Sequence, residues 1–171
     1  MRNGRHLLLI GLPGSGKTTV GRQLAAALSL PFIDLDEVIM QDVGQTVPRF
    51  FESHDEAAFR DVESAALRKV IQLPSHVIAT GGGAVLREEN RLLLQESGCV
   101  FFLDRPVESI AKTLDLTTHP TLQGTTISEM AALRRPLYLS CADHVITDEN
   151  VDDTTRHCAE FWRKNHEVSH H

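Results

Sequence analysis

The chain has 171 residues, of which 42% are hydrophobic and 23% are charged, a composition typical of one globular domain with its own core. The length is short for two such domains. The formal net charge is -6, from 17 Lys and Arg against 23 Asp and Glu. This balance excludes a nucleic-acid binder that relies on a generally basic surface, although it leaves room for a local basic pocket.

Cysteine usage and hydropathy indicate the compartment. The three cysteines, Cys99, Cys141 and Cys158, are an odd number without C-x-x-C spacing, so we expect reduced core thiols rather than a disulfide or zinc framework. The apolar run Leu7–Ile10 is too short for a signal peptide, and no apolar stretch approaches the roughly 20 residues that cross a bilayer. A cytoplasmic protein without membrane contact is therefore expected.

The first predicted elements enclose a phosphate-binding motif. The run Leu7–Ile10 is typical of a buried strand, and residues 19–28 carry apolar side chains at helical spacing. Between them, residues 11–18 read GLPGSGKT and fit the pattern G-x-x-x-x-G-K-[ST]. A strand, a glycine-rich turn and a helix form the context in which backbone N–H groups and a helix N-terminus bind phosphate. The flanking elements disfavour the alternative, a glycine turn with a chance lysine.

A second strand is predicted over 32–36, and it carries Asp34 and Asp36. Side chains two apart on a strand point to the same face, so one carboxylate can hold Mg²⁺ near Thr18 while the other orients or deprotonates a substrate hydroxyl. The alternative is that Asp36 caps a following helix. Two short helices are expected before residue 55.

A helix starting near Asp55 carries Arg60 close to its buried side, which is marked by Phe59. A guanidinium there can grip a carboxylate through two hydrogen bonds, with Glu63 holding it in place. The alternative is an ordinary surface ion pair. A third strand over 76–80 then leads into Gly81–Gly83, and three successive glycines indicate a ligand lying directly on the backbone.

The remaining elements continue the alternation of helix and strand. We expect a helix over 87–96, a strand over 100–103, a helix over 106–114, a mobile loop over 115–125, a helix over 128–140 capped by Ser128, a strand over 144–147 and a closing helix from 151. Arg134 and Arg135, which follow the loop, can clamp a phosphoryl group or a carboxylate. The alternative for this pair is a basic patch at a helix end.

Strands that alternate with helices and consist of short apolar, β-branched runs predict an α/β fold with a parallel sheet covered on both faces. Ligands of such sheets bind beyond the carboxyl ends of the strands. Four of the features fall at that edge: the phosphate loop, the Asp34/Asp36 pair, the three glycines and the region after Leu103. Their common location predicts one site for two substrates.

The ordered set of motifs resembles the shikimate kinase family. The resemblance runs from about residue 7 to about residue 147 and is carried by GLPGSGKTTVG (11–21), FIDLDEVI (32–39), FFESHDEAAFRDVE (50–63), ATGGGAV (79–85) and RRPLYLSCAD (134–143). It implies a single-domain P-loop kinase over 1–171, with a five-stranded parallel sheet flanked by helices. The core would span about 5–165, the lid about 113–125 and the substrate-binding helices about 36–62.

The family resemblance implies transfer of the γ-phosphoryl group of ATP to the 3-hydroxyl of shikimate by a monomer, with Mg²⁺ as cofactor. Lys17, Asp36 and Asp34 would be catalytic, and Thr18 and Asp34 would hold the metal. ATP would be bound by Pro13, Gly14, Ser15, Gly16, Lys17, Thr18, Thr19, Lys112 and His119. Shikimate would be bound by Asp36, Arg60, Gly81, Gly82, Gly83 and Arg134.

The chain departs from the family pattern in the lid. His119 stands where the family usually carries an arginine, Lys112 stands where an arginine packs on adenine, and Asp55 replaces a glycine. Histidine is only partly charged near neutral pH and cannot fork onto a phosphate. Either His119 acts as imidazolium, or Lys112 or Arg135 replaces the arginine, or activity is weak. A kinase for another carboxylated polyol and a low-activity, regulatory nucleotide-binding homologue therefore remain as alternatives.

Overall fold

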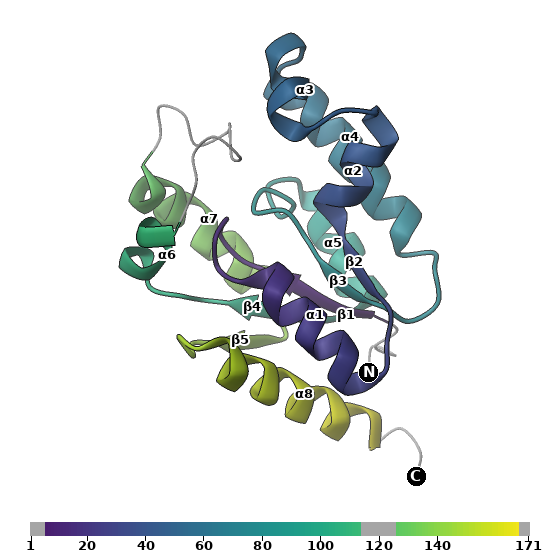
Figure 1. Ribbon diagram of the computed structural model, residues 1–171, viewed down its shortest axis with the longest axis vertical. Coiled ribbons are helices and arrows are strands. Elements are labelled where there is room, and N and C mark those ends of the chain that lie inside the picture. The colour runs from purple at the N-terminus through teal and green to yellow at the C-terminus, as the bar shows by residue number, and fades with distance from the viewer. Residues whose placement is uncertain (1–5, 114–125, 168–171) are drawn as a thin grey trace.

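The computed structural model describes residues 6–113 and 126–167, which alternate strands and helices (Figure 1). In chain order the elements are β1 (His6–Ile10), α1 (Lys17–Leu28), β2 (Phe32–Asp34), α2 (Leu35–Val43), α3 (Val47–Ser53), α4 (Glu56–Val70), β3 (Val77–Ala79), α5 (Glu88–Ser97), β4 (Gly98–Leu103), α6 (Val107–Thr113), α7 (Ile127–Cys141), β5 (His144–Ile146) and α8 (Val151–Glu167).

The five strands form one parallel sheet in the order β2-β3-β1-β4-β5. The central strand β1 lies between β3 and β4, with Leu8 opposite both Ile78 and Val100. All five residues of β1 are fully buried. A strand covered on both faces needs a continuous apolar run rather than an alternating one, which is what Leu7–Ile10 supplies.

Helices cover both faces of the sheet. Because successive side chains of β1 point to opposite faces, they pack in two separate cores. Leu7 and Leu9 pack in one core with residues of α1 and α8, and these two helices contact each other. Leu8 and Ile10 pack in a second core with residues of α2, α4, α5 and α7. Figure 1 shows α2, α3 and α4 gathered beyond the β2 edge. The α/β fold and the five-stranded parallel sheet expected from the sequence are confirmed.

Two sequence predictions about element ends are wrong. The second strand ends at Asp34 rather than at residue 36, because the Asp34 side chain accepts a hydrogen bond from the backbone N–H of Asp36 and starts α2 there. The cap of α7 is Thr126 and not Ser128, since the Thr126 hydroxyl accepts from the N–H of Glu129. In both cases a side chain slightly earlier in the chain satisfies the first free N–H groups of the helix.

Cys99, Cys141 and Cys158 are buried and unpaired with one another, as expected. Burial raises the pKa of the Cys158 thiol to about 12, so that thiol stays protonated. Among residues 6–113 and 126–167, no helix has both the length and the apolar character to cross a membrane.

Candidate active site

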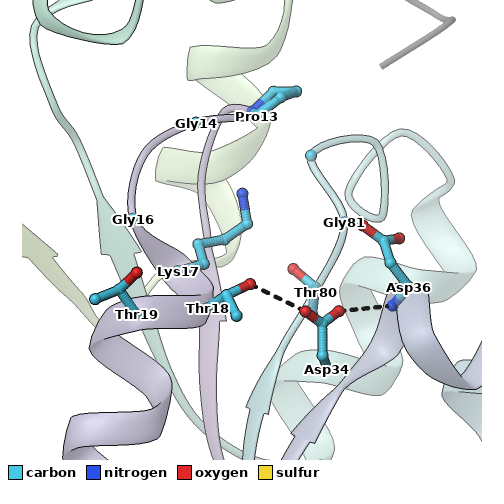
Figure 2. A pocket seen from close by; sticks show the side chains of 11 residues that line it. Pro13, Gly14, Gly16, Lys17, Thr18, Thr19, Asp34, Asp36, Thr80 and Gly81 are labelled. Carbon is cyan, nitrogen blue, oxygen red and sulfur yellow. Dashed lines mark hydrogen bonds between the residues drawn. The ribbon is translucent and has the colours of Figure 1, made fainter. Parts of the chain in front are cut away.

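A cleft of about 270 Å³ lies where β1, β2 and β3 end (Figure 2). It is lined by the loop after β1, by the β2–α2 junction and by the start of the segment after β3. The lining residues are Pro13, Gly14, Gly16, Lys17, Thr18, Thr19, Asp34, Asp36, Thr80, Gly81 and Gly82. Three motifs that the sequence placed at one sheet edge are therefore brought together.

The loop between β1 and α1 is shaped to receive an anion. Gly16 precedes α1 with φ 92°, a backbone conformation that side chains disfavour. Because Gly16 has no side chain to cap the helix and the first turn of α1 holds no acidic residue, the first N–H groups of α1 receive no side-chain cap among the described residues. These groups and the positive end of the helix dipole favour a bound phosphate.

Lys17 brings a positive charge into this loop. Its side chain is buried, and its Nζ donates hydrogen bonds to the carbonyl oxygens of Gly11 at 2.7 Å and Leu12 at 2.9 Å. Burial lowers the pKa of Lys17 to about 8, although Asp36 and Asp34 act in the opposite direction. The ammonium group is thus charged at neutral pH and held in the wall of the cleft.

Asp34 and Asp36 do not lie on one strand, which corrects the sequence prediction. Asp34 is the N-cap of α2, and Asp36 lies in the first turn of that helix. Helix geometry therefore separates the two carboxylates: Asp34 Oδ2 accepts from the Thr18 hydroxyl at 3.0 Å, whereas the Asp36 side chain points toward Gly81 (Figure 2). The alternative that Asp36 caps this helix is also wrong, because the cap is Asp34.

Asp36 has the properties of a base that works near neutral pH. Burial raises the pKa of its carboxyl to about 6, and the nearby carboxylates of Asp34 and Glu63 act in the same direction. Lys17 and Arg60 lower it in part. A carboxylate with a pKa close to the working pH can accept a proton from a substrate hydroxyl.

The pair of Thr18 and Asp34 fits a magnesium ion. A hydroxyl and a carboxylate oxygen lie 3.0 Å apart at the mouth of the phosphate loop, and both are the hard oxygen ligands that Mg²⁺ prefers. Within the described ranges, no three His, Cys, Asp or Glu side chains are arranged to hold a metal. Mg²⁺ is usually held by one or two carboxylates together with substrate phosphates and water, so a two-residue protein site is compatible with it.

Arg60 and Glu63 form a buried ion pair, and the expectation that Glu63 holds Arg60 is confirmed. Arg60 Nη1 donates to Glu63 Oε1 at 2.9 Å, and the side chains are 8% and 1% exposed. The alternative, a surface ion pair, is wrong. Arg60 Nε and Glu63 Oε2 are buried without a hydrogen-bond partner among the described residues. Burial raises the pKa of Glu63, and its charged neighbours Arg60, Arg134 and Arg87 counteract this shift.

Arg134 is buried in the middle of α7, 5% exposed, so the alternative of a basic patch at a helix end is wrong. Burial lowers the pKa of Lys17, and the nearby Arg134 adds to this shift. Burial raises the pKa of the Tyr138 phenol to about 12, and the nearby Arg134 counteracts this shift. Arg60 and Arg134 are thus two buried guanidinium groups near the carboxylate of Glu63, and Arg60 is also near that of Asp36. Such a basic wall can neutralise an acidic substrate.

Neighbouring protein atoms crowd two of the three glycines after β3. A β-carbon on Gly82 would lie 2.5 Å from the Pro13 ring, and one on Gly83 would overlap the buried Arg60 guanidinium. The sequence interpretation, that a ligand lies directly on this backbone, is thus not needed to explain Gly82 and Gly83. The segment instead wedges between the phosphate loop and Arg60, and so joins the two halves of the cleft.

Arg60, Gly83 and Arg134, described above, are not among the residues that line the cleft, and four further residues in the sequence predictions also lie away from it. Ser15 is buried beneath the loop, and its N–H donates to Leu12 O. Lys112 is exposed on α6. Arg135 forms an exposed ion pair with Asp104 at 2.9 Å. His119 lies outside the described residues, as does most of the predicted lid.

Sequence reasoning missed two residues of the site. Thr80 lines the cleft, and its hydroxyl donates to Leu9 O, which ties the end of β3 to β1. Tyr138 is 1% exposed, and its hydroxyl donates to the carbonyl of Gly82 at 2.5 Å. Its position four residues after Arg134, on the same side of α7, was a signal that could have identified it.

With this geometry established, comparison with known proteins identifies the family. The family model for shikimate kinase matches residues 13–163 of the chain. The chain belongs to the shikimate kinase family. The shikimate kinase of Neisseria gonorrhoeae is 42% identical over 159 residues, which cover 90% of this chain and 93% of that protein. The shikimate kinase of Paracidovorax citrulli is 44% identical over 161 residues, which cover 88% of each.

A solved structure agrees with this assignment. The shikimate kinase from Acinetobacter baumannii in complex with shikimate is 32% identical, covers 96% of both chains and superposes with a TM-score of 0.90. Membership of the shikimate kinase family makes the chain a phosphotransferase, and the cleft combines the phosphate loop and Lys17 with the carboxylates of Asp34 and Asp36.

Proposed function

We propose that the chain transfers the γ-phosphoryl group of ATP to the 3-hydroxyl of shikimate, giving 3-phosphoshikimate and ADP. One observation carries the assignment: Asp36, a carboxylate with a pKa of about 6, lies beside the phosphate loop and near the buried Arg60, and Arg134 is buried near Glu63, the ion-pair partner of Arg60. A polyol that also bears a carboxylate matches this set of charges. The Acinetobacter relative, which was solved with shikimate, supports the same acceptor.

The donor half is proposed to consist of the phosphate loop and the start of α1. Backbone N–H groups of Gly14, Gly16 and Thr19 cradle the phosphates. Pro13, which has no N–H, and Ser15, whose N–H donates to Leu12 O, complete the loop around them. Lys17 contacts the terminal phosphates. Thr18 and Asp34 hold Mg²⁺, which when bound neutralises phosphate charge and orients the transferred group. Lys112 and His119 remain proposed contacts of the nucleotide.

The acceptor half is proposed to hold shikimate by its hydroxyls and its carboxylate. Asp36 and the Gly81–Gly83 segment contact the hydroxyls, and Arg60 and Arg134 pair with the carboxylate. Glu63 and Glu56 accept hydrogen bonds from Nη1 and Nη2 of Arg60, whereas the buried Nε of that guanidinium has no partner among the described residues. A charge-assisted contact with two guanidinium groups discriminates strongly against an acceptor that lacks the carboxylate.

The reaction follows from this arrangement. Asp36 accepts the proton of the 3-hydroxyl while that oxygen forms a bond to the γ-phosphorus. The bond between the γ-phosphorus and the β,γ-bridging oxygen breaks, and ADP leaves with both electrons of that bond. Lys17 and the N–H groups at the start of α1 stabilise the charge on the transferring group, and positioning of this kind is the main source of rate in phosphoryl transfer.

The chain is further proposed to act as a monomer in the cytoplasm. Every group required by the mechanism comes from one chain, so the site does not depend on a second copy. Three buried cysteines remain unpaired with one another, which is typical of a reducing compartment.

A coupled assay of ADP release tests the assignment with shikimate, quinate, gluconate and nucleoside monophosphates as acceptors. We expect turnover of shikimate, loss of turnover in Lys17→Ala, and a large rise in the KM of shikimate in Arg60→Ala. Turnover of quinate or gluconate without shikimate would instead identify a kinase for another carboxylated polyol. Binding of ADP without turnover of any acceptor would identify a low-activity, regulatory homologue.

A further inference from the structure

Arg105 lies beside the phosphate loop although it is far from that loop in sequence. It is the second residue after β4, the strand that pairs with β1, so the carboxyl ends of the two strands are neighbours. A β-carbon built on Gly16 would lie 3.8 Å from Arg105 Nη1, an ordinary van der Waals distance. The guanidinium is therefore placed directly against the backbone at the start of α1.

This guanidinium is half-buried and has no counter-charge among the described residues. Its Nε is buried without a hydrogen-bond partner in residues 6–113 and 126–167. The adjacent carboxylate, Asp104, is instead engaged by Arg135 at 2.9 Å. A buried N–H donor without a partner costs free energy, so such a group in a native site calls for a ligand or another explanation.

The surroundings indicate which ligand. The first turn of α1 has neither an acidic residue nor a side-chain cap, and it begins with the buried ammonium of Lys17. Arg105 adds a second fixed positive charge to the same helix end. Unlike lysine, arginine keeps its charge at every accessible pH and offers several donors in one plane, a geometry that suits phosphate oxygens.

We propose that Arg105 is a further phosphate-binding residue of the donor half, which pairs with the polyphosphate chain of the nucleotide. The proposal rests on the proposed function only in taking a nucleoside polyphosphate as the ligand of the loop. It gives the donor half a permanently charged arginine from the sheet edge, independent of the residues at positions 112 and 119. Neither Lys112 nor Arg135 is placed as favourably, because one is exposed and the other is paired with Asp104.

Binding of ADP and of inorganic tripolyphosphate, measured by calorimetry without any acceptor, tests the proposal. In Arg105→Ala we expect the Kd of both probes to rise about tenfold, the scale of one charge-assisted contact. Arg105→Lys retains the charge but not the fork and should fall between Arg105→Ala and the wild type. The matched control is Arg156→Ala, which removes an exposed arginine paired with Asp153 on α8 and should bind both probes normally.

Each other outcome overturns the proposal. Unchanged Kd values in Arg105→Ala would remove Arg105 from the site. Weaker binding of ADP with normal binding of tripolyphosphate would place the contact on the nucleoside. Weaker binding of shikimate by the same factor, measured separately, would indicate a general structural defect. Because these titrations need no turnover, a failure of shikimate phosphorylation would not affect them.

Discussion

Replacing Asp36 with asparagine should make the protein more stable while abolishing its activity. The structure holds the Asp36 carboxyl where burial and two neighbouring carboxylates raise its pKa from 3.8 to about 6. Asparagine has nearly the same shape as the protonated acid but carries no charge. The variant therefore removes the cost of keeping a buried carboxylate ionised, and it also removes the proposed base.

The sign and the magnitude of this gain in the free energy of unfolding follow from proton linkage. Between pH 3.8 and about 6 the folded protein binds more protons at Asp36 than the unfolded chain does, so the free energy of unfolding falls as pH rises. The cost is absent well below pH 3.8 and complete above about pH 6. A shift of about two pKa units corresponds to about 3 kcal/mol at pH 7.5, and only about 1 kcal/mol of this cost has developed at pH 4.5.

Urea unfolding of wild type and Asp36→Asn at pH 4.5 and pH 7.5 measures these values. We expect the variant to gain stability at both pH values and to gain about 2 kcal/mol more at the higher one. Glu52→Gln, which removes an exposed carboxylate of α3, is the control and should show no such pH-dependent gain. A variant that is equally or less stable than wild type at pH 7.5 would refute the proposed environment of Asp36.

Three further predictions concern the same cleft. The kcat/KM for ATP, which reports the protonation states of the free enzyme, should rise with pH through about 6 as Asp36 ionises and fall above about 8 as Lys17 loses its proton. A flat profile from pH 5 to 9 would contradict both roles. Tyr138→Phe removes the hydrogen bond to the Gly82 carbonyl and should destabilise the protein by about 1 kcal/mol, which urea unfolding measures. It should also raise the KM of shikimate more than that of ATP in steady-state kinetics. Gly82→Ala places a methyl group against the phosphate-loop proline and should cost about 1–3 kcal/mol and most of the activity. The control is Gly44→Ala, because Gly44 has φ 70° and open space around its α-carbon. This variant should lose stability through backbone strain alone and keep its activity. Equal loss of activity in both alanine variants would show that crowding at residue 82 is not the cause.

Local patterns determined the fold class and the donor half of the site. The donor half is encoded by residues that are close together in the sequence: the apolar run of β1 and the glycines and lysine of residues 11–18. The sequence alone therefore predicts a strand, an anion-binding turn and a helix. The alternation of short strands with helices likewise predicts a parallel sheet, because such strands need long crossover connections. The resemblance to the family added the prediction that Arg60 and Arg134 bind the acceptor.

The tertiary structure decided the roles that depend on burial and on contacts between distant segments. An i+2 spacing suits a strand face or a helix start equally well, and only the hydrogen bond from Asp36 N–H to Asp34 showed that a helix begins there. Arg60 and Glu63 have the spacing of a surface ion pair, and only the packing of α4 makes them a buried one.

Contacts between distant segments also explain the glycines after β3 and the position of Arg105. Gly82 packs against Pro13, about 70 positions earlier in the chain, and no local pattern reports such a contact. Arg105 follows β4 in an unremarkable turn, and it reaches the phosphate loop because β4 pairs with β1. The sequence by itself determined that the chain binds a nucleoside triphosphate at the end of a parallel sheet. Which charges face that nucleotide and its acceptor depends on how segments far apart in the chain pack together, and this only the fold decided.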